Sequence, residues 1–221
     1  MKVLSCRHIE VDEIWTIVRK KQQRLTRREK SNNAIGDQYT FVAMDADTKL
    51  IPCFEVSKRD GRTALRFIRD LKAWLTDRIQ LTSDGFSGYV EAVWSAWADE
   101  VDYAQLVKMY EAENPGPGRY CPPRVSVVVS TTISGSPDPE RVCTSYVERQ
   151  NLTIRMACGR FTRLTNALSK KLENLKTALA LHFAYYNFVR IHRSLRVTPA
   201  MAAGVTNKLW SIGDLLLESK S

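Results

Sequence analysis

The chain has 221 residues, 44% of them hydrophobic, which is enough to bury the core of one large domain or of one domain with an appendage. Its 33 lysines and arginines outnumber 24 acidic residues, and the resulting net charge of +9 indicates an anionic partner such as nucleic acid. Five scattered cysteines without a Cys-x-x-Cys pair exclude a zinc ribbon and a disulfide framework, and no apolar run is long enough for a membrane span. We therefore expect a soluble cytoplasmic protein with no membrane partner.

The first part of the chain predicts strands followed by a helix. Residues 4–18 are rich in β-branched and aromatic types and form a predicted strand, with Asp12 at its centre, where aspartate is uncommon. The strands predicted at 39–44 and 50–56 are joined by a polar turn into an antiparallel hairpin, and Pro52 indicates that the second one is an edge strand. The next helix carries apolar residues at helical spacing, which we assign to the core.

A second acidic residue follows another apolar run. The strand predicted at 79–85 ends in Asp84-Gly85, and the glycine allows a sharp turn that leaves the carboxylate at the carboxyl end of the strand. Ligand sites of open α/β sheets lie outside such strand ends. Taken alone, the pair is better explained by an ordinary Asp-Gly turn or helix cap. A helix over 89–97 and a fifth strand over 101–107 follow.

The third acidic residue lies on a predicted helix. Residues 111–140 are rich in proline and glycine and predict a long loop, broken by a valine-rich stretch that forms a strand or ribbon. The helix predicted at 141–155 carries Glu148, and Arg155 lies two turns later on the same face. Such a pair is ordinarily a solvated ion pair, so its meaning depends on the other two acids.

The rest of the chain is strongly basic. A three-four spacing of apolar residues predicts a long amphipathic helix from Phe161 to Asn187, and the tail over 209–217 predicts a last short helix. Between Arg149 and Arg196 there are ten basic residues and one acid, Glu173. This segment is therefore a candidate surface for a phosphate backbone.

These elements predict an α/β fold with a mixed five-stranded sheet flanked by helices and a long basic C-terminal helix. Acids on the first strand, the fourth strand and the late helix could then meet at one edge of the sheet. Asp12, Asp84 and Glu148 would suffice to hold two Mg²⁺ ions, which prefer oxygen ligands and keep several waters. Glu13 is the alternative to Asp12, because neighbouring strand positions face opposite ways and only one should point at the site.

Four segments carry a resemblance to a known family. Residues 11–15, 82–86 and 146–155 resemble the three acidic motifs of insertion-sequence-one-type (IS-one family) DDE transposases, and 187–201 resembles the C-terminal signature of that family. The similarity covers essentially the whole chain. It implies an RNase H-like, integrase-like catalytic domain over residues 1–200, with a C-terminal tail over 201–221.

The resemblance also implies a reaction, cleavage of DNA at insertion-sequence ends followed by attack of the freed 3′-hydroxyl on target DNA. Asp12, Asp84 and Glu148 would be the catalytic residues and the ligands of two Mg²⁺ or Mn²⁺ ions, and Arg155 would contact DNA near the scissile phosphate. The residues expected to contact DNA are Arg149, Asn151, Arg155, Arg160, Arg163, Lys170, Lys171, Arg190, His192 and Arg193.

One departure concerns how the DNA would be found. Nothing in the sequence corresponds to the N-terminal zinc-binding and helix-turn-helix module of full-length members, so we expect the catalytic part alone, with an upstream-encoded DNA-binding module as a candidate partner. The implied partners are double-stranded DNA, as element ends and target, and further copies of the chain assembled on DNA at the nucleoid.

Other interpretations remain open. A stand-alone metal-dependent nuclease and a non-catalytic DNA-binding remnant both fit a basic chain with three acidic residues. His182 and His192 could be taken as metal ligands, although ten residues apart near a helix they are more typical of packing or phosphate contacts.

Overall fold

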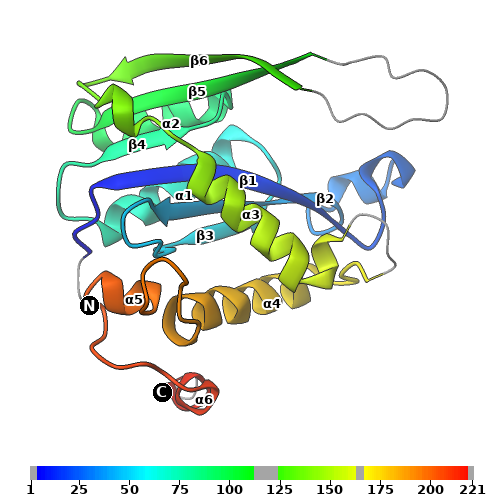
Figure 1. Cartoon of the computed structure of the whole chain (residues 1–221). Helices are drawn as coiled ribbons and strands as arrows, with labels where there is room; N and C mark the ends of the chain where they lie inside the picture. The colour runs from blue at the N-terminus through cyan, green and yellow to red at the C-terminus, as the bar shows by residue number, and fades with distance from the viewer. Residues whose placement is uncertain (1–3, 112–123, 163–166, 219–221) are drawn as a thin grey trace.

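The computed structural model describes residues 4–111, 124–162 and 167–218 (Figure 1). Within these residues six strands form one open mixed sheet in the order β3-β2-β1-β4-β5-β6. Three of the five pairings are antiparallel, and β4 pairs in parallel with both β1 and β5. The strands are β1 (His8–Val18), β2 (Gly36–Asp45), β3 (Phe54–Ser57), β4 (Gln80–Ser83), β5 (Asp102–Glu111) and β6 (Arg124–Ser134).

The expected α/β class with a mixed sheet and flanking helices is confirmed, but the predicted number of five strands is wrong. The sixth strand is the valine-rich stretch, which pairs antiparallel with β5 along nearly its whole length. Most of its side chains are exposed, so the strand is held by backbone pairing rather than by burial. The prediction of β3 as an edge strand is confirmed, and Pro52 lies just before it.

Helices cover both faces of the sheet (Figure 1). One core joins Ile9 and Val11 of β1 to α1 and α2, and a second core joins Ile14 and Val18 of the same strand to α3 and α4. Odd-numbered positions of β1 therefore face one helical layer and even-numbered positions face the other, as the pleat requires. The helices are α1 (Gly61–Trp74), α2 (Ser87–Trp97), α3 (Ser145–Ala157), α4 (Leu172–Ala184), α5 (Pro199–Ala202) and α6 (Ile212–Glu218).

The long C-terminal helix predicted from Phe161 is shorter than expected. Helix α4 begins only at Leu172, because Ser169 shortly before it forms an isolated bridge with Val18 at the end of β1. It continues into a π-helical turn, Tyr185–Val189. No helix among the described residues is long and apolar enough to cross a membrane.

The tail is attached to the main body by aromatic contact. The ring of Trp210 packs on the ring of Phe188 with 4.7 Å between centroids, and the Trp210 amide donates to the carbonyl of Phe188. These contacts link the segment that precedes α6 to the π-helical turn.

Candidate active site

The pairing of β1 with β4 brings two aspartates to the same level of the sheet. In this parallel pair Val11 lies opposite Ser83. Asp12 follows Val11 in β1, and Asp84 follows Ser83 at the end of β4. Strand β4 ends there, and the Asp84 carboxylate accepts a hydrogen bond from the Phe86 amide at 3.0 Å, which fixes the turn into α2. Gly85 does not adopt a positive φ. It is suited to its place because a Cβ there would lie 3.0 Å from a Val107 methyl.

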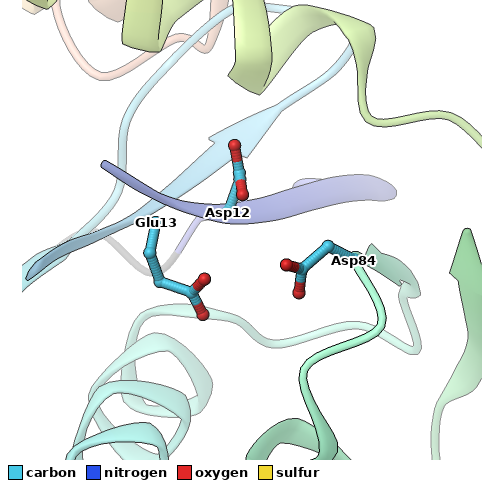
Figure 2. A group of neighbouring side chains, drawn as sticks. All are labelled: Asp12, Glu13 and Asp84. Carbon is cyan, nitrogen blue, oxygen red and sulfur yellow. The ribbon is translucent and has the colours of Figure 1, made fainter. Parts of the chain in front are cut away.

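Glu13 joins the two aspartates. Figure 2 shows Asp12 and Glu13 on opposite sides of β1, with the carboxylate of Asp84 turned toward both. One carboxylate oxygen from each of these three residues lies within 4.8 Å of the others. The expectation that only one of Asp12 and Glu13 could reach the site is therefore wrong, because Asp84 lies beside β1 within reach of Asp12 on one side and of the longer Glu13 side chain on the other.

Glu148 is brought to the same place by an anchor at the start of α3. The carboxylate of Glu10, which is 2% exposed, accepts hydrogen bonds of 2.9 Å from the amides of Tyr146 and Val147. These amides belong to the first turn, where a helix has no backbone acceptors for its N–H groups and attracts negative charge. One turn later Asn151 donates to Asp12 at 2.8 Å.

The resulting cleft has a volume of about 340 Å³ and is lined by Asp12, Asp84 and Glu148 together with Lys108 from β5. Glu148 accepts from Lys108 Nζ at 2.5 Å and from Thr144 Oγ1 at 2.7 Å. It is thus in the cleft, but outside the tight group formed by Asp12, Glu13 and Asp84.

A second cation lies against the acidic group on the other side. Arg59 Nε donates to Glu13 at 3.2 Å, and its Nη2 donates to Asp84 at 3.3 Å. The guanidinium also lies over the ring of Phe86, 4.2 Å from its centroid, where a cation is attracted by the ring face. Arg59 therefore balances part of the negative charge that the three acids concentrate.

The acids are nevertheless costly to ionise together. Burial, together with the charges of Asp84 and Glu148, raises the pKa of Asp12 to about 6, while hydrogen bonds from the Glu13 backbone and Asn151 oppose the shift. Burial likewise raises the pKa of Glu13 to about 7, with Asp84 adding to the shift and Arg59 opposing it. Ionised carboxylates in this group would therefore be stabilised by additional positive charge.

The donor set fits a hard divalent cation. The Glu13 side chain is 3% exposed, and its Oε1 has no hydrogen-bond partner among the described residues. A buried, unpaired carboxylate oxygen is expensive, and oxygen ligands from Asp12, Glu13 and Asp84 are the type that Mg²⁺ and Mn²⁺ prefer. Glu148, across the cleft, could complete the set for a second ion.

The residues predicted to contact DNA do not all lie on one surface. Arg149, Arg190, His192 and Arg193 line a single cavity next to α3. Lys170 and Lys171 are exposed before α4, and Arg155 is half-buried on α3. Arg160 donates to Ser169 Oγ at 2.9 Å, a contact within the fold. Arg163 lies outside the described residues.

Asn151, also predicted to contact DNA, is 5% exposed and donates a hydrogen bond to Asp12. Neither histidine considered as a metal ligand lies in the acidic group. His182 packs edge-on against Phe183, and His192 lies in the basic cavity.

Sequence reasoning missed Glu10, Arg59 and Lys108. Glu10 had a usable signal, because it lies two residues before Asp12 and so on the same face of a strand that is otherwise apolar. Arg59 and Lys108 had none, since each is one cation among 33 and its role depends on which acid it meets in space.

The chain matches no protein-family model and no curated protein. The functional assignment therefore depends on the geometry and chemistry of this cleft.

Proposed function

We propose that the chain is a DDE transposase of the insertion-sequence-one type with an RNase H-like catalytic domain, acting on double-stranded DNA. The observation that carries the proposal is the cleft in which Asp12, Asp84 and Glu148 meet from β1, the end of β4 and α3. These are the three acids that the sequence motifs select, and they are separated by 72 and 64 residues along the chain. The mixed sheet with helices on both faces supports the finer fold assignment.

The chain's own residues would prepare the cleft for phosphoryl transfer. Asp12, Glu13 and Asp84 would hold one Mg²⁺ or Mn²⁺ ion, and Glu148 with Asp12 a second. When bound, two such ions activate a water or a 3′-hydroxyl and stabilise the leaving oxygen. Asn151 orients Asp12, and Glu10 holds the first turn of α3 so that Glu148 faces the cleft.

Lys108 would neutralise part of the phosphate charge once Glu148 is engaged. Its ammonium lies on the cleft wall, and its side chain is 22% exposed. A cation positioned beside a transferring phosphoryl group stabilises the charge that develops on its oxygens.

The test is a joining assay with the full chain, supplied with the DNA segments that flank its gene. A duplex ending in a labelled 3′-hydroxyl is incubated with a supercoiled plasmid and Mg²⁺ or Mn²⁺. We expect the label to appear covalently in the plasmid, and Asp84→Asn and Glu148→Gln to reduce joining at least about 100-fold, since these ligands support several kcal/mol of transition-state stabilisation.

The control is Asp99→Asn, which removes an exposed carboxylate from the turn after α2 and should leave joining unchanged. Plasmid cleavage without joining would identify a nuclease and reject the transposase assignment. If neither reaction occurs, including after fusion to a helix-turn-helix module that recognises the tested DNA, the enzymatic proposal is wrong.

A further inference from the structure

A second cavity, of about 650 Å³, lies next to the acidic cleft along α3. Its wall on α3 is formed by Tyr146, Arg149, Gln150 and Thr153, spaced at the intervals of one helical face. Glu148 belongs to the neighbouring face and lines the acidic cleft. The helix thus separates an acidic cleft from this second cavity, which we call the basic pocket.

The charge of the basic pocket is of one sign. No acidic residue is among the described residues that line it. The five cations that do so are Lys49, Arg149, Arg190, Arg193 and Arg196. In the described part of the chain, no carboxylate lies within salt-bridge distance of any of these five. Cations gathered in a concave site without acids create a strong positive potential that concentrates anions.

One of these cations is held rigidly. Lys49 is 9% exposed, has a positive φ of 61°, and donates to the carbonyl of Ala46. Its ammonium lies 3.0 Å from the ring centroid of Tyr146. The pKa of Lys49 is lowered by burial, whereas the charge of Glu10 opposes that shift. A lysine fixed in this way offers a preformed charge in the lining of the pocket.

The shape favours a chain of phosphates over a single one. Arg190, Arg193 and Arg196 are exposed and Lys49 is buried, yet all four line the same pocket. One phosphate could not neutralise five cations distributed over this volume, but successive phosphates of a nucleic-acid strand could. Because the pocket shares α3 with the acidic cleft, a strand bound there can continue to the three carboxylates.

We infer that the basic pocket binds the phosphodiester backbone of DNA at a position separate from the reacting bond. The inference rests on the proposed function for its choice of DNA, and it assigns Lys49 and Arg196 to DNA binding in addition to Arg149, Arg190, His192 and Arg193. It also separates DNA binding from catalysis, because binding through the pocket requires neither the acidic group nor a metal ion.

The experiment measures binding without chemistry. The full chain is titrated into a fluorescent DNA duplex in EDTA at several salt concentrations, and the dissociation constant is obtained from anisotropy. Arg190→Ala/Arg193→Ala should weaken binding at least about tenfold and reduce the slope of log K against log salt by about 2, one for each lost phosphate contact.

The matched control is Arg62→Ala/Arg69→Ala, which removes the same charge from exposed positions of α1 on the other face of the sheet. It should change the dissociation constant less than about threefold. Arg190→Lys/Arg193→Lys keeps the charge and should restore most of the affinity, which separates a lost contact from a folding defect.

Several outcomes overturn the inference. Equal weakening by the two alanine pairs would show that only net charge matters. Displacement of the duplex by inorganic phosphate or a mononucleotide at concentrations comparable to those of DNA phosphate would indicate a small-anion site. The binding measurement in EDTA does not depend on any reaction, so a failure of the joining assay would reject the proposed function without affecting this result. Conversely, if the wild type joins DNA and the Arg190/Arg193 alanine variant binds the duplex as tightly as the wild type, only the inference about the pocket is rejected.

Discussion

Asn151 of α3 donates a hydrogen bond of 2.8 Å to Asp12 of β1, across 139 residues of sequence. The amide is 5% exposed, and Asp12 is one of the acids whose ionisation burial opposes. This bond fixes the Asp12 carboxylate and also the rotation of α3. Because Glu148 lies three residues earlier on the same side of the helix, the same bond sets where Glu148 enters the cleft.

Asn151→Ala should therefore impair both stability and reaction. Losing a hydrogen bond to a carboxylate costs about 1.5–3 kcal/mol, which chemical denaturation would measure in EDTA. The joining activity should fall by more than the loss of stability explains, when it is measured under conditions where the variant is fully folded. Asn174→Ala, at an exposed position of α4, serves as the control and should alter neither quantity. Full activity of the Asn151 variant would contradict a positioning role.

Glu10 is expected to act through α3. Glu10→Ala leaves the Tyr146 and Val147 amides without their acceptor, so the free energy of unfolding should fall by about 1–3 kcal/mol. Glu10→Gln keeps one carbonyl oxygen at the same place and should recover most of the loss. If both variants lose joining equally while stability differs, Glu10 acts in the reaction rather than through the helix.

Arg59 should compete with a divalent cation for the same acids. Since its guanidinium bonds to Glu13 and Asp84, Arg59→Ala removes a positive charge from the group that would bind the ion. We expect Mn²⁺ to bind several-fold more tightly to this variant in a calorimetric titration. Arg66→Ala removes an exposed cation paired with Glu55 and should leave the affinity unchanged. Weaker Mn²⁺ binding by Arg59→Ala would show that the arginine supports the site instead.

The sequence predicted the elements of this site better than their contacts. Asp12 could be found because an acid within an apolar strand is unusual, and Asp84 because it ends one. Whether the two aspartates lie side by side depends on the register of β1 with β4, and this register is set by tertiary packing rather than by the sequence of either strand. The helical start at Leu172 was missed for a similar reason, because Ser169 is held by the sheet although its neighbours carry a helical pattern.

The alternation of side chains along a strand does not exclude Glu13 from the site. Its backbone position does face away from Asp12, but a glutamate has one more methylene than an aspartate and can turn back to the end of a neighbouring strand (Figure 2). Alternation along a strand fixes the direction of Cβ, while the position of a carboxylate at the end of a longer side chain depends on its rotamers.

The raised pKa of Glu13 gives a prediction about stability and pH. Its pKa is about 7 in the folded protein and 4.5 as its ordinary value, so between these limits the folded state retains a proton that the unfolded state has lost. Raising the pH through this window therefore lowers the contribution of Glu13 to stability, by about 1.4 kcal/mol for each unit of pKa difference. The contribution is complete below pH 4.5 and levels off above pH 7.

Glu13→Gln remains neutral at every pH and should escape this loss. Measured by urea unfolding in EDTA, the variant should gain stability relative to the wild type as the pH rises from 5 to 7.5, by up to roughly 3 kcal/mol. Glu91→Gln, at an exposed position of α2, should show no such trend. Saturating Mn²⁺ should stabilise the wild type more than Glu13→Gln at pH 7.5, because binding requires the ionised carboxylate. A difference between wild type and Glu13→Gln that stays constant from pH 5 to 7.5 would show that Glu13 does not titrate in this range.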